Sequence, residues 1–177
     1  MLASFIFADL TSETHSMAFA DSYLGRLRTL VGNRLVLMPG ARIVIERADG
    51  RILLQKRTDF GLWAVPGGNA EEAEGLETLI MREVVEETGL IVTGIEPFGF
   101  ACNPQYETFQ FQNGDQAQYF ALMFYTRSCE GEPAVTDDES TAVGWFAPDR
   151  LPEVLPNMAR TIEAYSRFKA TGKFQMI

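Results

Sequence analysis

The chain has 177 residues, 46% apolar and 22% charged, which suits one globular domain with a hydrophobic core. Its net charge of −9, without a Lys/Arg-rich stretch, argues against a protein that holds duplex nucleic acid by its phosphates. Cys102 and Cys129 form neither a metal motif nor a disulfide scaffold. His15 is the single histidine, so a histidine-rich metal site is excluded.

The first ten residues are apolar, but they lack a basic region and are interrupted by Asp9. They therefore predict neither a signal peptide nor a membrane span, and we expect a cytoplasmic protein without a membrane partner. Residues 1 to about 19 show little periodicity and are expected to be poorly ordered, with Met17 as a candidate native start. We predict that residues 1–35 are an N-terminal extension, partly disordered and then a short helix, and that one main domain covers residues 36–170.

A short amphipathic helix is predicted from the N-cap Ser22 to the stop signal at Gly32. Its apolar residues recur at helical spacing and are Tyr23, Leu24, Leu27 and Leu30. We expect this face to pack on the core or to form a contact in a homodimer.

Two β-rich runs, residues 41–47 and 51–57, flank Ala48-Asp49-Gly50 and predict a hairpin. Arg57 ends the second run near Trp63, and both are candidate substrate-binding residues. For Arg57 the alternatives are contact with a phosphate or a charge at the edge of a sheet.

The segment Gly68–Leu90 contains seven glutamates and one arginine. Glu83, Glu86 and Glu87 fall at i, i+3 and i+4, so on a helix they crowd one face and repel each other. Two of them also lie in the last turn, where the helix dipole favours cations. A bound cation would relieve this repulsion, and oxygen ligands without His or Cys favour Mg²⁺ or Mn²⁺. The alternative is a solvated acidic face on which Arg82 pairs with Glu86.

The spacing of this segment resembles the signature of the Nudix (MutT-like) hydrolase family. A glycine is followed after five residues by a glutamate, and after seven more by Arg-Glu-aliphatic-x-Glu-Glu-x-Gly-aliphatic. The matching positions are Gly68, Glu74, Arg82, Glu83, Val84, Glu86, Glu87, Gly89 and Leu90.

The resemblance implies a loop-helix-loop with a helix at about Leu76–Thr88 and hydrolysis of a nucleoside diphosphate linked to another moiety. It implies that Glu83, Glu86, Glu87 and the carbonyl of Gly68 bind the metal. Arg82 would orient the loop or a neighbouring glutamate, and Glu74 would stabilise the loop. Family members often have glycine where this chain has Ala73, so we expect the loop Asn69–Glu74 to follow a somewhat different course.

Beyond this segment, residues 91–101 are predicted to form a strand with a loop. Residues 107–112 and 116–126 flank Asn113-Gly114-Asp115, a strong hairpin turn signal. On this hairpin we expect a substrate base to contact some of Tyr106, Phe109, Phe111, Gln118 and Tyr119, with Tyr106 and Gln118 as the named candidates. The alternative is that these aromatic residues belong to the core.

The loop Asp137–Ser140 precedes a strand predicted at Trp145 and Phe146. In the Nudix family a glutamate from such a loop completes the metal site or acts as general base, which points to Glu139, with Asp138 as the alternative. The last helix is predicted to begin near Asn157, to end before Gly172 and to pack through its aromatic and aliphatic residues.

Strands in pairs, a central helix and helices at the ends predict an α/β fold, an α/β/α sandwich with a mixed sheet as in the Nudix fold. The predicted function is Mg²⁺- or Mn²⁺-dependent hydrolysis of a pyrophosphate bond, with water as nucleophile. Nucleotide sugars, nucleoside triphosphates and dinucleoside polyphosphates are candidate substrates. The alternative is a non-catalytic nucleotide-sensing module.

Overall fold

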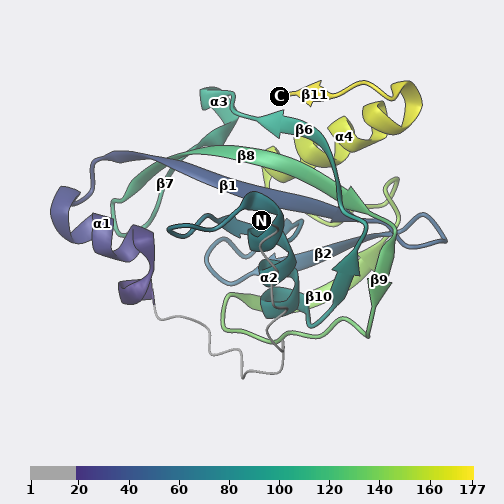
Figure 1. Ribbon diagram of the computed structural model, residues 1–177, viewed down its shortest axis with the longest axis horizontal. Coiled ribbons are helices and arrows are strands. Elements are labelled where there is room, and N and C mark those ends of the chain that lie inside the picture. Colours follow the sequence, from purple (N-terminus) through teal and green to yellow (C-terminus); the bar gives the residue numbers. More distant parts are fainter. Residues whose placement is uncertain (1–18) are drawn as a thin grey trace, which may run out of the picture.

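The computed structural model describes residues 19–177 and is built around a six-stranded mixed sheet in the order β11-β6-β8-β1-β4, with β7 also paired to β8 (Figure 1). The central pair, β1 and β8, is parallel, whereas β4, β6 and β7 join antiparallel. Two smaller sheets, β10-β2-β3 and β5-β9, lie beside it.

The helices are η1 Phe19–Asp21, α1 Tyr23–Val31, α2 Leu76–Thr88, α3 Pro104–Glu107 and α4 Pro156–Thr171. The strands are β1 Leu35–Ile45, β2 Ile52–Arg57, β3 Trp63–Ala64, β4 Gly67–Asn69, β5 Ile91–Thr93, β6 Glu96–Ala101, β7 Thr108–Gln110, β8 Gln116–Thr126, β9 Ser128–Glu130, β10 Ser140–Phe146 and β11 Gln175–Met176.

The sheet lies between α2 and α4 because residues along β1 alternate between its two faces. Ile43 and Ile45 face α2 and pack with Leu79, whereas Val44 faces α4 and packs with Tyr165. This arrangement confirms the predicted α/β/α sandwich with a mixed sheet. Among the helices of residues 19–177, none is both long and apolar enough to cross a lipid bilayer.

Several predicted local elements are confirmed. Ser22 caps α1 by accepting from the N–H of Gly25, and Gly32 ends the helix. The helix α2 has the bounds expected from the family resemblance. The turn around Gly114 joins β7 to β8, and α4 ends at Gly172 in the left-handed conformation. Within the predicted apolar face of α1, however, Leu30 is 83% exposed.

The predicted hairpin of residues 41–47 and 51–57 is wrong beyond its turn. β1 and β2 share only an isolated bridge between Glu46 and Ile52, and then separate into different sheets. β2 pairs instead with β10 and β3, so the strands that come later in the chain take its hydrogen-bonding edges. The expectations for residues 1–18, including Met17 and His15, lie outside the described residues.

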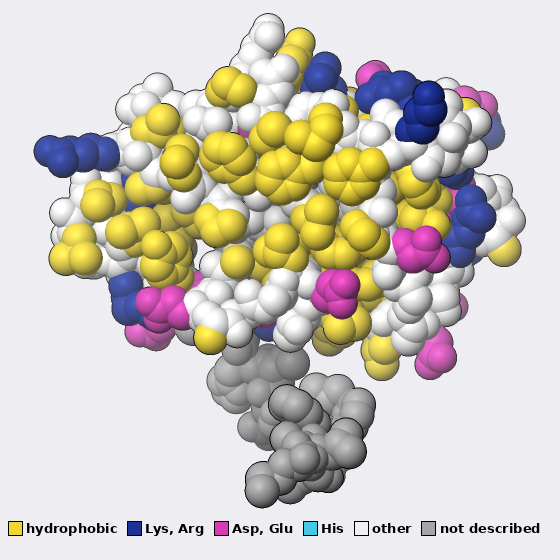
Figure 2. Space-filling model, turned by 45° about the horizontal axis from the view of Figure 1, so that its top comes forward, with side chains coloured by type: hydrophobic (Ala, Val, Ile, Leu, Met, Phe, Trp, Pro, Cys, Tyr) yellow, Lys and Arg dark blue, Asp and Glu magenta, His cyan; other side chains and the backbone are white. Residues whose placement is uncertain are grey.

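Hydrophobic side chains form a band on the face of the molecule seen when the top of Figure 1 is turned forward (Figure 2). Exposed apolar residues of the sheet include Leu35, Leu37 and Met176, which are 47%, 62% and 64% accessible. Apolar patches often mark sites of association between proteins. The homodimer stays a prediction.

Ala73 has φ 63° and is the one residue other than glycine with positive φ among residues 19–177. Alanine therefore adopts the left-handed conformation here and bears steric strain of about 1–2 kcal/mol. The different course expected for the loop Asn69–Glu74 stays a prediction.

We expect Ala73→Gly to increase the free energy of unfolding by about 0.5 kcal/mol, because relief of strain outweighs the added flexibility of the unfolded chain. Urea unfolding measures this change. Ala48→Gly is the matched control, since Ala48 is also exposed but lacks positive φ, and it should lower stability. Equal losses in the two variants would contradict the strain at Ala73.

Candidate active site

The loop before α2 approaches β1 so closely that several positions have no room for a side chain. β4 pairs with β1 so that Gly68 lies opposite Ala41. A Cβ atom on Gly67 would lie 2.5 Å from the carbonyl oxygen of Ala41. A Cβ atom on Gly68 would lie 2.1 Å from Oε1 of Glu83. The glycines thus bring the Glu83 carboxylate directly against the backbone of the loop.

Glu87 lies behind this contact, and its side chain is only 1% exposed. Its Oε2 accepts a hydrogen bond from the N–H of Gly67 at 3.0 Å, whereas Oε1 has no partner among the described residues. Complete burial, and then the nearby charge of Glu83, raise the pKa of Glu87 well above its usual value. The side chain anchors the loop through one oxygen and leaves its second oxygen, Oε1, without a hydrogen bond to the described residues.

Arg82 binds three carboxylates of the same segment. Its Nε and one terminal nitrogen donate to both oxygens of Glu74, at 2.8 and 3.0 Å. The other terminal nitrogen donates to Glu83 at 3.1 Å and to Glu86 at 2.9 Å. These contacts raise the pKa of Arg82 and lower that of Glu74. Arg82 therefore offsets the repulsion expected along α2 and ties the helix to its preceding loop.

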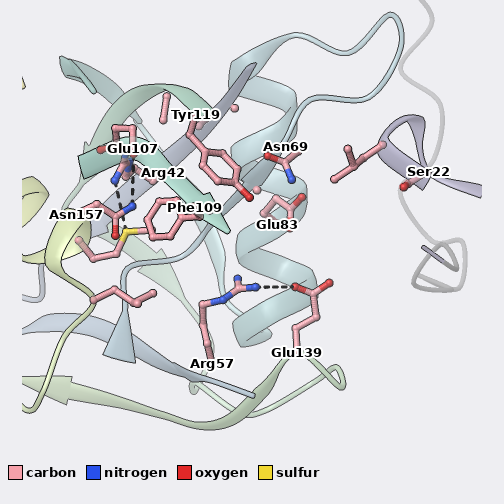
Figure 3. Close-up of a pocket in the computed structure, with 18 of the residues that line it drawn as sticks. Ser22, Arg42, Arg57, Asn69, Glu83, Glu107, Phe109, Tyr119, Glu139 and Asn157 are labelled. Carbon is pink, nitrogen blue, oxygen red and sulfur yellow. Dashed lines mark hydrogen bonds and ion pairs between the residues drawn. The ribbon is translucent and has the colours of Figure 1, made fainter. Parts of the chain in front are cut away.

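Burial raises the pKa of the Glu83 carboxyl to about 7, because its effect outweighs the attraction of Arg82. Figure 3 shows this side chain projecting from α2 into a cavity of about 480 Å³. Arg82, Glu86 and Gly68 also line the cavity, but Glu87 does not.

Arg57 and Glu139 lie on another side of the cavity (Figure 3). Arg57 forms two hydrogen bonds of 2.9 Å with Asp59, and its other contact is an ion pair with Glu139 at 3.9 Å. Burial alone would lower the pKa of Arg57, but Asp59 holds it above its usual value, so the charge is permanent. The backbone N–H of Thr58 donates to the carbonyl of Glu139, which fixes that loop. Asp138 does not line the cavity.

A buried polar cluster at the opposite side was not predicted from the sequence. Arg42 pairs with Glu107 at 2.7 Å, and both side chains are at most 3% exposed. Asn157 donates to Glu107 at 3.4 Å, and its own Oδ1 is buried without a hydrogen-bond partner among the described residues. All three residues line the cavity (Figure 3). The one available signal was Arg42 itself, a charge within the apolar run of β1 that requires a buried partner.

Aromatic rings lie between this cluster and Glu83. Phe109 packs edge-on to Tyr119 with their centroids 5.7 Å apart, and Phe60 contacts Phe109 and Phe111 at 6.1 and 5.9 Å. All four rings line the cavity. These rings are inclined to one another and provide an aromatic wall next to the polar cluster.

Three predicted substrate-binding residues do not line the cavity. Trp63 packs against Phe146 at 4.6 Å, and Tyr106 lies in α3 with its ring under the guanidinium of Arg160 at 3.9 Å. Gln118 lies beside Tyr119 on β8, so it points to the other face of the sheet. We therefore correct the substrate-binding set by removing these three residues.

Residues 36–167 match the NUDIX domain family. The chain belongs to this family. A MutT-like protein of Streptomyces ambofaciens is 38% identical over 110 residues, which cover 62% of this chain and 64% of that protein. An ADP-ribose pyrophosphatase of Methanocaldococcus jannaschii is 31% identical over 147 residues, or 80% and 82% of the two chains. The crystal structure of a MutT NUDIX hydrolase from Burkholderia pseudomallei has a TM-score of 0.62 and 30% identity, covering 73% of this chain and 98% of that one.

The Nudix segment provides oxygen donors suited to a hard divalent cation. Glu83, Glu86 and Glu87 present carboxylates, and the unpartnered Oε1 of Glu87 is a buried donor. As they stand, these groups are not gathered, and no set of three His, Cys, Asp or Glu side chains within residues 19–177 converges as in a metal site. Arg82 lies between Glu83 and Glu86 and binds one oxygen of each, so the second oxygen of Glu86 is the one that is free of this ion pair.

We expect Mg²⁺ or Mn²⁺ to raise the melting temperature of the protein, because either ion should bind the folded carboxylates only. Gly68→Ala should abolish most of this shift, since the added Cβ displaces the Glu83 carboxylate. Thermal melts with and without the ion test this expectation.

Gly75→Ala is the matched control. Gly75 has φ −80°, and a Cβ there would meet only Thr78 at 4.0 Å. Replacing this N-cap glycine costs at most about 1 kcal/mol and should leave the metal-dependent shift intact. A full shift in Gly68→Ala would contradict the role given to Glu83.

Proposed function

We propose that this Nudix protein hydrolyses a pyrophosphate bond in a nucleoside diphosphate joined to a second moiety, with water as nucleophile and with Mg²⁺ or Mn²⁺. The supporting observation is one cavity with four kinds of lining residue. These are Glu83 and Glu86 of α2, the permanently charged Arg57, the exposed carboxylate of Glu139, and aromatic rings beside the buried polar cluster. The name of the relative from Methanocaldococcus, ADP-ribose pyrophosphatase, also supports a substrate of this class.

The phosphates would lie between α2 and Arg57. The metal would neutralise phosphate charge and activate water, and Glu83, Glu86 and Glu87 with the Gly68 carbonyl would hold it. Arg57 can add a fixed positive charge from the other side, because Asp59 keeps its guanidinium in place. The phosphates would thus lie between a metal ion on the α2 side and a guanidinium on the other side. These positive charges would offset the negative charge that makes a pyrophosphate bond resist attack by an anion.

Glu139 is our candidate for the general base. Its side chain is 65% exposed and lines the cavity, so its carboxylate is free to accept a proton from an attacking water. Its ion pair with Arg57 places this carboxylate next to the proposed phosphate site. Asp138, the alternative, is less suitable because it lies outside the cavity.

The nucleoside would occupy the opposite end. Its base would stack on Phe109 or Tyr119 and direct its edge at Asn157. Within residues 19–177, Oδ1 of Asn157 is a buried acceptor that lacks a partner, and the Glu107 carboxylate beside it also accepts hydrogen bonds. This end therefore favours a base with an exocyclic amino group, which offers two N–H donors, over uracil, whose single N3–H donor lies between two carbonyl oxygens.

Glu86→Gln is expected to lower kcat on the order of 100-fold, because a ligand of the charge-stabilising site is lost. Purified protein with Mg²⁺ is assayed on a panel of nucleoside diphosphate compounds by separating the products. Glu77→Gln is the matched control, since Glu77 is exposed in the first turn of the same helix. Equal turnover in both variants would contradict the metal assignment. No turnover of any compound by the wild type would favour the nucleotide-sensing module.

Asn157→Leu should lower kcat/KM for adenosine compounds by about tenfold and change it little for the matching uridine compounds, because one buried acceptor is removed. The ratio of the two kcat/KM values is the measurement, and the uridine compound serves as the internal control. An equal loss on both substrates would mean that Asn157 supports the structure without reading the base.

A further inference from the structure

The segment η1–α1 forms part of the cavity although it precedes residues 36–167, which match the NUDIX family. Phe19, Ser22 and Leu24 all line the cavity. Figure 3 shows Ser22 on the side away from Glu107 and Asn157, with Glu83 between. A molecule with its phosphates at Glu83 and its base at Asn157 would direct its remaining part toward this segment.

Hydrogen bonds and ion pairs fix α1 to the loop that precedes α2. The N–H of Tyr23 donates to Glu71 at 2.8 Å, and Arg26 pairs with Glu72 at 2.8 Å. Because Glu71 in turn donates its N–H to Glu74 at 3.2 Å, α1 is connected to the Arg82 network. The segment is thus joined to the same loop that holds the glutamates.

The other side of α1 is attached to the central sheet. Leu27 and Val31 pack against Val36 and Met38 of β1. Arg28 donates to the carbonyl of Gln116 at the start of β8, at 2.7 Å. Contacts on two sides give α1 a defined position relative to the cavity.

The turn that carries Phe19 is also specified locally. The Ser22 hydroxyl donates to the carbonyl of Phe19 at 2.8 Å. A Cβ on Gly25 would lie 1.9 Å from that same oxygen, so only glycine allows η1 to fold back over α1. This close approach places Phe19 at the cavity although its side chain is 61% exposed.

We propose that Phe19, Ser22 and Leu24 form a wall that contacts the moiety joined to the nucleoside diphosphate and determines which moiety is accepted. The inference rests on the proposed function. The three residues carry no charge, and Arg26 on the same helix is paired with Glu72. Such a wall does not attract a terminal phosphate. It suits a neutral ring with apolar and hydroxyl groups, such as a sugar.

The test compares a nucleoside diphosphate sugar with a nucleoside triphosphate of the same base, using the full chain. Phe19→Ala and Leu24→Ala should raise KM for the sugar compound on the order of tenfold, with kcat nearly unchanged. KM for the triphosphate should change less than twofold. Phe19 is largely exposed, so its variant is expected to fold even if loss of Leu24 weakens the packing of α1.

Leu30→Ala is the control, because Leu30 lies on the same helix, is 83% exposed and does not line the cavity. It should leave both KM values unchanged. An equal increase in KM for the two substrates in Phe19→Ala and Leu24→Ala, or no change in either KM, would overturn the proposal that this wall selects the moiety.

Calorimetric binding of the sugar compound in EDTA separates this inference from the proposed hydrolysis. If the wild type binds but does not cleave it, and Phe19→Ala weakens binding, the wall stands and the hydrolase proposal fails. If the wild type neither binds nor cleaves the sugar compound, the wall is overturned.

Discussion

The guanidinium of Arg82 holds together a segment whose own charges would otherwise separate it. Its planar donors reach Glu74 on one side and both Glu83 and Glu86 on the other. A lysine would offer a single point charge and lose the two-oxygen contact with Glu74. Loop and helix are thus one electrostatic unit. The unit extends through Glu71 to α1, so the position of the N-terminal helix depends on the same guanidinium.

The second constraint is the strand β1, because two adjacent parts of this strand position two different parts of the cavity wall. At Gly40 and Ala41 its backbone lies close enough to the glycine loop to hold Gly68 under Glu83. One residue later, Arg42 points to the other face and pairs with Glu107 in the polar cluster. The glycine loop and the polar cluster are therefore positioned by consecutive residues of one strand.

The sequence was most informative where structure depends on local contacts. The turn at Gly114 and the end of α4 at Gly172 follow from turn residues and stop signals that are adjacent in the chain, and the bounds of α2 follow from the family resemblance of its segment. The hairpin prediction was wrong because the same turn can join two strands that stay paired or two strands that separate. The pairing of β2 with β10, which comes later in the chain, decides between these outcomes. The polar cluster could not be found because its members lie far apart in sequence. On β8, adjacent residues point to opposite faces of the sheet, so only one of Gln118 and Tyr119 can face the cavity. The sequence alone does not show that this residue is Tyr119.

The parallel pairing of β1 with β8 also bears on how the protein folds. Leu35 lies opposite Gln116, and Ile45 lies opposite Thr126, so every contact of this central pair closes a long loop of chain. Such distant pairings fold slowly, because the entropy of loop closure is lost before the contacts form. The acidic helix needs only neighbouring residues to form, yet the strand that holds its glycine loop is secured only after β8 has been synthesised. The acidic helix can therefore form early, whereas the central pair of strands beside its glycine loop is complete only once β8 has joined β1.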